Sequence, residues 1–304
     1  MLRKKFSLKV IFIILLSLAS CTNPDKLASQ NGATINNSNC FFAYLSSIRL
    51  PNQLEWCGEA LPLNNPEIRE RAERELFLLL QQPGQIILYL KRSGRFFPVY
   101  EKILAEKGMP DDLKYLSVAE SALYMSVSDK GAAGLWQLMP ETAQKLGLQV
   151  DENIDERLNT EKSTRAALKY LKDGFNQFSS WAMAAAGYNM GYTNLAKSAS
   201  IQSSDKYYDL YLNQETSRFL FRIALIKELM VNASNYGFIP EKIERYPPDN
   251  YNYIQCNEQV DDLQKWSKTK GTNYKDLKLL NPWIKKYFIP SPPKGKVYEV
   301  AVPK

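Results

Sequence analysis

Helical patterns follow one another between residues 40 and 240, and almost no strand signal occurs before residue 250. Asn65-Pro66 is typical of a helix start, with asparagine as the cap and proline at the first helical position. The segment TEKSTRAALKYLKDGFNQF has apolar residues at helical spacing. We therefore expect a mainly α domain over residues 40–245.

The remaining elements are predicted from the same signals. Helices are expected at about 66–82, 85–92, 97–107, 135–146, 161–178, 180–190 and 214–231, with a further helix opening at Pro110. A hinge is predicted at Tyr246-Pro247-Pro248-Asp249. Beyond the hinge, the pattern predicts a small α+β domain of βααβ order over residues 250–304.

The chain begins with MLRKKFSLKVIFIILLSLASC, in which a basic stretch precedes a short apolar run and small residues. This order is typical of an export signal over residues 1–20, and the run is shorter than the roughly 20 residues that span a membrane. Residues 21–39 are polar and are predicted to form a flexible tether. An uncleaved anchor and ordinary secretion remain alternatives.

The end of this segment, Leu18-Ala19-Ser20-Cys21, resembles the lipobox of bacterial lipoproteins. The resemblance implies cleavage before Cys21 and acylation of that cysteine, which would hold the protein on a membrane. Thr22 follows the cysteine. By analogy with enterobacterial sorting, this residue favours the outer membrane of a Gram-negative bacterium.

The charge and the missing histidine exclude several classes of function. Four basic residues among residues 1–20 account for +4 of the net charge of +7, and the remaining +3 is too mild to indicate a nucleic-acid partner. Without histidine, Ser–His–Asp and Cys–His systems and most zinc sites are excluded. No cofactor or metal is expected. Cys40 and Cys57 could form a disulfide in an oxidising compartment, which leaves Cys256 buried or paired elsewhere.

Glu120 is the residue that most needs an explanation. In KYLSVAESAL, a helix places Leu116, Glu120 and Leu123 on one face. Burying a carboxylate is costly unless its pKa rises and the group becomes neutral, so Glu120 is a candidate proton donor. Pairing with a lysine or arginine, or exposure at the helix edge, is the alternative.

Two later segments carry candidate binding residues. SDKGAAGLWQLMPETA is glycine-rich, so a ligand can approach its backbone closely, and it contains Trp136 and Gln137. A flat apolar ring beside an amide suits a sugar. WAMAAAGYNMG places Tyr188 and Asn189 at a helix end, with Gly191 as a candidate C-cap. Taken alone, Trp136 and Tyr188 would each be interpreted as core residues.

Together, these segments resemble the lytic transglycosylase (SLT domain) family. The resemblance rests on Glu120-Ser121, GAAGLWQ with Met139-Pro140, and AGYNMG, and it extends upstream through YLKRSGRFFPVYEKILAEKGMPDDLKYL. It implies a lysozyme-like helical fold and cleavage of peptidoglycan glycan strands. It also implies that Glu120 is the catalytic acid and base and that Ser128, Gln137, Tyr188 and Asn189 contact the substrate.

This sequence departs from the family pattern at two places. Leu123-Tyr124-Met125 follows the glutamate segment where Asn-Pro is common, and the interval to Ser128 is one residue shorter than in many members. Gly187 stands where alanine is usual. The first departure puts the role of Ser128 in question.

The reaction implied by the resemblance needs one carboxylate. Glu120 protonates the bond between N-acetylmuramic acid and N-acetylglucosamine, the muramyl N-acetyl oxygen attacks C1, and Glu120 then deprotonates the C6 hydroxyl to close a 1,6-anhydro ring. Ordinary glycosidases use two carboxylates. Asp129, the nearest second candidate in the sequence, is interpreted as a solvated turn residue.

The segment 250–304 resembles a degenerate LysM module, with Leu280-Asn281-Pro282 at the usual place. The resemblance implies binding of glycan, and a small packing domain is the alternative. Two further hypotheses remain for the whole chain. It could be a non-catalytic peptidoglycan-binding scaffold lipoprotein, or a hydrolytic lysozyme of the same fold.

Overall fold

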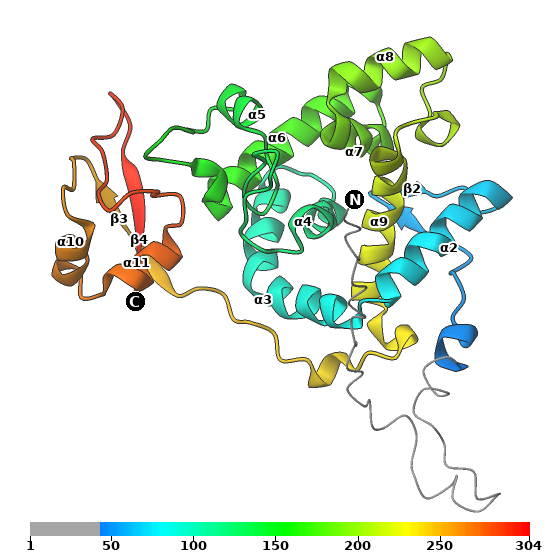
Figure 1. Cartoon of the computed structure of the whole chain (residues 1–304), viewed down its shortest axis with the longest axis horizontal. Helices are drawn as coiled ribbons and strands as arrows, with labels where there is room; N and C mark the ends of the chain where they lie inside the picture. Colours follow the sequence, from blue (N-terminus) through cyan, green and yellow to red (C-terminus); the bar gives the residue numbers. More distant parts are fainter. Residues whose placement is uncertain (1–42) are drawn as a thin grey trace, which may run out of the picture. The chain divides into compact units, whose positions relative to one another are not determined.

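A computed structural model describes residues 43–304 (Figure 1). One compact unit spans Leu50–Lys304, and residues Met1–Arg49 belong to a separate unit. The predicted signal peptide, the tether, Cys21 and Cys40 lie outside the described residues. The predicted domain boundaries likewise stay predictions.

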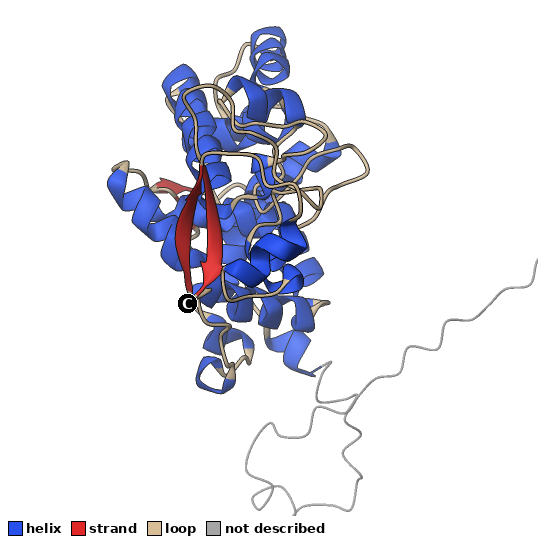
Figure 2. Cartoon of the chain, turned by 90° about the vertical axis from the view of Figure 1, so that its left-hand side faces the viewer, coloured by secondary structure: helices blue, strands red, loops and turns tan. Residues whose placement is uncertain are grey.

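Helices make up most of the described chain, as Figure 2 shows, which confirms the predicted mainly α class. Asn65 caps α2 by accepting a hydrogen bond from the Glu67 N–H at 3.0 Å, and Pro66 is the first helical residue. The α-helices between residues 50 and 250 are α2 (Pro66–Leu80), α3 (Pro83–Glu106), α4 (Lys114–Ser121), α5 (Pro140–Lys145), α6 (Thr160–Phe178), α7 (Trp181–Met190), α8 (Tyr192–Gln202) and α9 (Gln214–Val231).

Three of the predicted helix boundaries were wrong. The expected helices at 85–92 and 97–107 form the single helix α3, which continues through Pro98. A short 3₁₀ turn, Asp111–Leu113, precedes α4, and α5 begins only at Pro140 rather than at residue 135. The helix α8 was not predicted.

The helix α7 lies at the centre of the fold, in contact with α6, α8 and α9. Its residues from Trp181 to Gly187 are all buried. Gly187 is required by the packing, because a Cβ atom there would lie 2.0 Å from the ring of Tyr192. The glycine that departs from the family pattern therefore accommodates the first residue of α8.

A short hairpin that the sequence did not predict, β1 (Glu55–Trp56) and β2 (Glu59–Ala60), holds the start of α7. The Glu59 carboxylate accepts hydrogen bonds from the backbone N–H groups of Trp181 and Ala182. A carboxylate at a helix N-terminus satisfies free N–H groups and is favoured by the helix dipole. The hairpin thus fixes the helix that ends in Tyr188 and Asn189.

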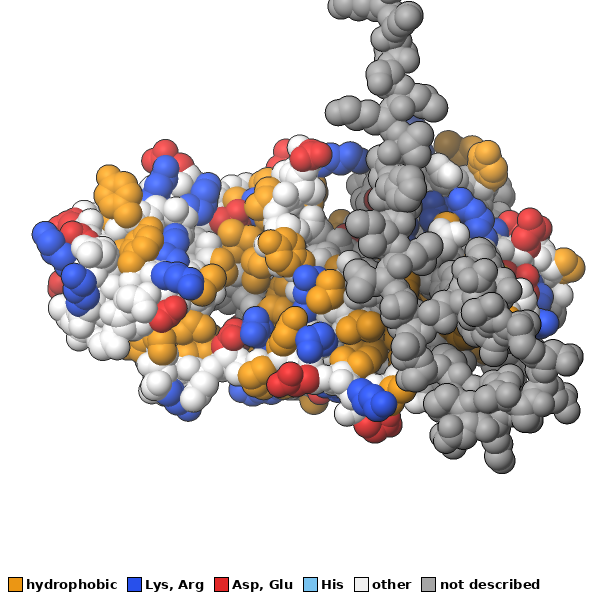
Figure 3. All heavy atoms as spheres, turned by 60° about the horizontal axis from the view of Figure 1, so that its bottom comes forward, with side chains coloured by type: hydrophobic (Ala, Val, Ile, Leu, Met, Phe, Trp, Pro, Cys, Tyr) orange, Lys and Arg blue, Asp and Glu red, His pale blue; other side chains and the backbone are white. Residues whose placement is uncertain are grey.

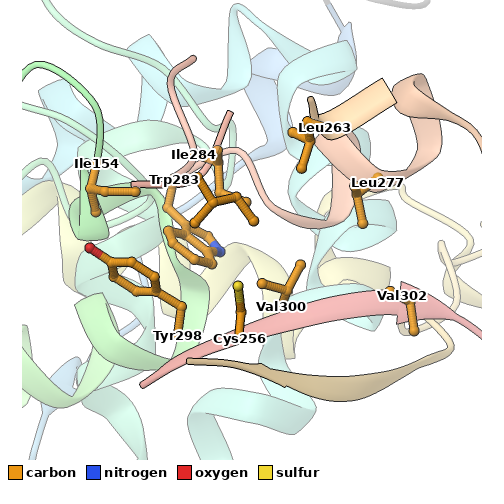
Figure 4. Packing of buried hydrophobic residues seen from close by; sticks show 10 residues of the cluster. Ile154, Cys256, Leu263, Leu277, Trp283, Ile284, Tyr298, Val300 and Val302 are labelled. Carbon is orange, nitrogen blue, oxygen red and sulfur yellow. The ribbon is translucent and has the colours of Figure 1, made fainter. Parts of the chain in front are cut away.

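The C-terminal segment has the predicted βααβ order. Its elements are β3 (Tyr251–Cys256), α10 (Leu263–Thr269), α11 (Tyr274–Leu280) and β4 (Tyr298–Pro303). The two strands pair antiparallel, with Tyr251 opposite Pro303 and Cys256 opposite Tyr298. Figure 4 shows the buried cluster between the strands and the two helices.

One residue of the helical domain completes this C-terminal core. Ile154 is fully buried in the cluster, beside Trp283 and Tyr298 in Figure 4. Two backbone hydrogen bonds of 2.8 Å flank it, from the Asp155 N–H to the Trp283 carbonyl and from the Lys285 N–H to the Asn153 carbonyl. The two domains therefore share a packed and hydrogen-bonded contact along residues 153–155.

On the face shown in Figure 3, basic and acidic side chains are interspersed with apolar ones. Within residues 43–304, none of the helices has both the length and the apolar character that a membrane crossing requires. The predicted absence of a nucleic-acid partner is not tested by these features and stays a prediction.

Replacement of Ile154 with alanine is expected to lower the free energy of unfolding by about 2–4 kcal/mol, because it opens a cavity in a closed core. Denaturant unfolding at equilibrium measures this loss. The matched control is Ile201→Ala, since Ile201 is 72% exposed and its truncation should change stability by less than about 0.5 kcal/mol. Equal effects of the two substitutions would contradict the shared core.

Candidate active site

Glu120 lies in the last turn of α4. Two serines of this helix bind the glycine-rich loop that connects α4 to α5. The hydroxyl groups of Ser117 and Ser121 both donate to the Leu135 carbonyl oxygen at 2.8 Å. Leu116 is fully buried and Glu120 is partly buried. The carbonyl end of a helix disfavours a negative charge, so the position of Glu120 in α4 itself opposes ionisation.

The surroundings of Glu120 raise the pKa of its carboxyl group to about 8. Burial is the largest cause, the negative charge of Glu215 adds to it, and the positive charge of Arg222 acts in the opposite direction. Among the described residues, no side chain or backbone group forms a hydrogen bond or ion pair with this carboxyl group. Glu120 is therefore mostly protonated at neutral pH and is free to donate its proton to a ligand.

Glu215 is a second carboxylate of the site, and the sequence analysis missed it. It lies in the first turn of α9, which Asn213 caps by accepting from the Thr216 N–H. The Asn189 amide donates to the Glu215 carboxylate at 3.2 Å and accepts from the Thr216 hydroxyl at 2.7 Å. Asn189 thus links the end of α7 to the start of α9 and holds the carboxylate that acts on Glu120.

Tyr188 connects the same helix end to the loop. Its hydroxyl donates to the Trp136 carbonyl oxygen at 2.6 Å. Burial, followed by the charge of Glu120, raises the pKa of Tyr188 well above its usual value, so the phenol stays neutral. The structure therefore brings Glu120, Tyr188 and Asn189 into one neighbourhood.

Gln137 lies on the loop with a left-handed backbone, at φ 47°. Its amide nitrogen donates to the carbonyl oxygens of Gly134 and Ser126, at 2.8 and 3.2 Å. Within residues 43–304 no donor is bound to its side-chain oxygen. Gln137 is partly exposed, and its free oxygen can accept a hydrogen bond from a ligand hydroxyl.

Ser128 occupies the exposed turn of the loop. Its hydroxyl accepts from the Ala132 N–H at 3.0 Å, and its carbonyl accepts from the Gly131 N–H at 2.9 Å. These hydrogen bonds are all local to the turn. Asp129 is exposed beside it, as the interpretation of a solvated turn residue requires.

The prediction that Trp136 contacts a sugar is wrong. Its side chain is fully buried, its indole N–H donates to the Thr164 hydroxyl at 2.8 Å, and its ring packs against Tyr100 with 5.1 Å between centroids. An indole enclosed on all sides has no face to offer a ligand. Trp136 instead joins the loop to α6 and α3.

Arg157 fixes the shape of the loop from beneath. Its guanidinium donates to the carbonyl oxygens of Gly131 and Leu138, at 2.6 and 2.9 Å, and pairs with the buried Asp155 at 2.8 Å. Gly134 passes close to this arginine, because a Cβ atom there would lie 2.1 Å from the Arg157 carbonyl oxygen. A side chain at residue 134 would displace the loop that carries Gln137.

Two cysteines lie in the described part of the chain. Within residues 43–304, Cys57 and Cys256 form no disulfide, and burial raises the pKa of both thiols. The pairing of Cys57 with Cys40 stays a prediction, because Cys40 lies outside the described residues. From residue 43 onward, no group of three cysteine, aspartate or glutamate side chains is arranged to hold a metal ion.

Two family descriptions match this chain. Residues 98–210 match the transglycosylase SLT domain, and residues 252–304 match the C-terminal LysM-like domain of soluble lytic transglycosylase. The first match contains Glu120, Gln137 and Tyr188, and it supports the expected lysozyme-like architecture. The second extends from the second residue of β3 through β4.

Two curated relatives are both described as membrane-bound lytic murein transglycosylase D, from Escherichia coli strains K12 and O6:H1. Each is 30% identical over 138 residues, which is 43% of this chain and 30% of the relative. This chain therefore matches under a third of the length of those relatives. A solved structure of an inactive mutant of lytic transglycosylase Slt from Pseudomonas aeruginosa aligns with 50% of this chain and 26% of that one, at 20% identity and a TM-score of 0.37.

The geometry and these matches agree on one segment of the chain. The residues that surround Glu120 belong to the part that matches the SLT domain or directly follow it. Residues 98–210 of this chain thus match the transglycosylase SLT domain, residues 252–304 match a LysM-like domain, and a 138-residue segment is homologous to membrane-bound lytic murein transglycosylase D.

Proposed function

We propose that this protein is a peptidoglycan lytic transglycosylase in which Glu120 alone acts as acid and base. The observation that carries the proposal is a partly buried carboxyl group with a pKa of about 8 and no protein partner in the described chain. A protonated carboxylic acid at neutral pH is what the first step of glycosidic cleavage requires.

The proposed reaction has two proton transfers through the same group. Glu120 donates its proton to the oxygen that links N-acetylmuramic acid to N-acetylglucosamine, and the bond from that oxygen to C1 breaks. The muramyl N-acetyl oxygen forms a bond to C1 and gives an oxazolinium. The C6 hydroxyl then attacks C1, its proton passes to Glu120, and the N-acetyl oxygen leaves C1. A 1,6-anhydromuramyl end results, and no water is consumed.

Glu215 supports both halves of this reaction. Its negative charge keeps Glu120 protonated before cleavage and favours the positive charge that develops at C1. We assign it an electrostatic role, with Asn189 as the residue that positions it. In this proposal the Gln137 side-chain oxygen accepts from a sugar hydroxyl, and Tyr188 supports the loop. Ser128 lies at the exposed rim.

The proposal extends to the location of the protein. We infer that Cys21 is acylated and holds the chain at the outer membrane of a Gram-negative bacterium, facing the periplasm, after removal of residues 1–20. The relatives described as membrane-bound support an envelope location. We also infer that the LysM-like domain at residues 252–304 binds the glycan that the SLT domain cleaves.

The activity is tested by digestion of purified cell-wall sacculi and mass spectrometry of the released fragments. The wild-type chain should release 1,6-anhydromuramyl products, and Glu120→Gln should reduce their rate of release by about 10²–10⁴-fold. Glu141→Gln is the matched control, because Glu141 is exposed at the start of α5.

The alternatives predict other results in this assay. A non-catalytic scaffold would release no fragments from sacculi, whether it is the wild type, Glu120→Gln or Glu141→Gln. A hydrolytic lysozyme would release reducing ends that incorporate ¹⁸O from labelled water. Either result would refute the proposed reaction.

Replacement of Glu215 with glutamine should move the alkaline limb of the pH–rate profile to lower pH. The charge of Glu215 raises the pKa of Glu120, so its removal lowers that pKa and the acid is lost at a lower pH. The profile of kcat/KM between pH 5 and 9 measures the shift. An alkaline limb that coincides with that of the wild type would show that Glu215 does not act on the acid.

The same pKa predicts how stability depends on pH. Between pH 4.5 and about 8 the unfolded chain loses the Glu120 proton while the folded chain retains it, so folding weakens as the pH rises. Relative to that of Glu120→Gln, the free energy of unfolding of the wild type should fall by up to about 1.4 kcal/mol per pH unit in this range. Above this range the difference between the two proteins should become constant. Denaturant unfolding of both proteins measures this, and a constant difference across the range would contradict it.

A further inference from the structure

A pocket of about 320 Å³ lies behind the Glu120 segment, where α2, α3, α4 and α9 meet. The helix α9 contacts the other three, and α3 also contacts α2 and α4 (Figure 1). The residues that line the pocket include Glu75, Gln85, Tyr89, Ala119, Arg218 and Arg222. Ala119 directly precedes Glu120, so the pocket adjoins the candidate acid along α4. A pocket of this size accommodates a small organic group.

The charges of the pocket do not cancel. Glu75 is 2% exposed, and its carboxylate is fully engaged by Arg218, through two hydrogen bonds, and by Arg74 at 3.1 Å. Arg222 has neither an ion pair nor a hydrogen bond among the described residues. After Glu75 and Arg218 compensate each other, one guanidinium of the pocket remains without a counter-charge.

A second group in the same pocket also lacks a partner. The side-chain nitrogen of Gln85 is buried and has no hydrogen-bond acceptor, the one such side-chain atom found within residues 43–304. Buried polar groups are nearly always hydrogen-bonded, so an unsatisfied one calls for a missing partner. Tyr89 lies on the pocket as well, and burial raises the pKa of its phenol, which therefore stays a neutral donor.

We propose that this pocket is a carboxylate-binding subsite for the muramyl side of the glycan strand, with Arg222 and Gln85 as its donors. The inference rests on the proposed function for the identity of the ligand. Guanidinium and amide N–H groups are complementary to a carboxylate, and a single uncompensated charge matches a monoanion. The carboxylate belongs either to the peptide stem or to the lactyl group of a muramic acid without a peptide.

The Arg222 side chain also connects the pocket to the acid. Its positive charge acts on Glu120 and on Tyr89. An arginine that lines the pocket and whose charge acts on Glu120 can hold a substrate carboxylate while the linkage is protonated. The subsite would therefore position the strand relative to Glu120.

Binding to the full chain in the Glu120→Gln background tests the proposal without turnover. The probes are a GlcNAc–MurNAc tetrapeptide, the same disaccharide with a free lactyl carboxylate, and chitobiose, which has no carboxylate. Calorimetry should show that Arg222→Gln weakens binding of a carboxylate probe at least about tenfold and leaves chitobiose unchanged. Gln85→Leu should weaken the same probe several-fold.

Two controls keep the result interpretable. Arg69→Gln, which removes a partly exposed arginine of α2 that pairs with Glu73 and does not line the pocket, should not change any affinity. Arg222→Lys keeps the charge but loses the planar fork, and its affinity should fall between those of arginine and glutamine. The melting temperature of each variant shows whether it is folded.

The outcomes separate the sources and the two proposals. A loss confined to the tetrapeptide assigns the stem carboxylate, and a loss with the free lactyl probe assigns the lactyl carboxylate. The subsite would be overturned if Arg222→Gln left the affinity for every probe unchanged. It would also be overturned if no carboxylate probe bound. Arg222-dependent binding together with no product release from sacculi would leave the subsite standing and refute the proposed reaction.

Discussion

The ion pair between Arg157 and Asp155 joins the two halves of the structure. Both side chains are buried. The guanidinium also donates to the carbonyl oxygens of Gly131 and Leu138, and the backbone N–H of Asp155 donates to the Trp283 carbonyl oxygen. A buried pair is stable only when such additional hydrogen bonds accompany it, and removal of one partner costs several kcal/mol. The loop beside Glu120 therefore depends on the same segment that completes the C-terminal core.

The candidate acid depends in turn on that loop. Ser117 and Ser121 bind the Leu135 carbonyl, so the last turn of α4 keeps its orientation only while the loop keeps its shape. The pKa of Glu120 then reflects burial and two opposing charges, Glu215 and Arg222, both on α9. The helix α4, the loop held by Arg157 and the α9 residues Glu215 and Arg222 together determine the protonation state of the Glu120 carboxyl group.

Local signals in the sequence predicted much of the fold. The cap at Asn65-Pro66 and the apolar spacing after residue 160 predicted helices that begin at residues 66 and 161. In the structure these helices begin at Pro66 and Thr160. The break expected between residues 92 and 97 did not occur, and the helix also continues through Pro98. Proline cannot donate to the Gly94 carbonyl, but buried side chains on both sides, among them Tyr89 and Tyr100, keep α3 continuous.

The candidate site was predicted less completely, for a physical reason. Glu120 could be found because it interrupts an apolar stripe, which is a local pattern. Glu215, Arg157 and Arg222 act through contacts between segments distant in sequence, and periodicity does not report such contacts. Trp136 was misassigned because a tryptophan beside a glutamine gives the same sequence pattern whether its ring is exposed to a sugar or buried. Only the structure shows that the ring is enclosed.

The account rests on the proton held by Glu120 at neutral pH. A ¹³C NMR titration of the full chain labelled at the glutamate carboxyl carbon, with Glu120→Gln to assign the resonance, measures this directly. The account predicts a midpoint near pH 8 for Glu120. A midpoint close to 4.5, the ordinary value for glutamate, would contradict it.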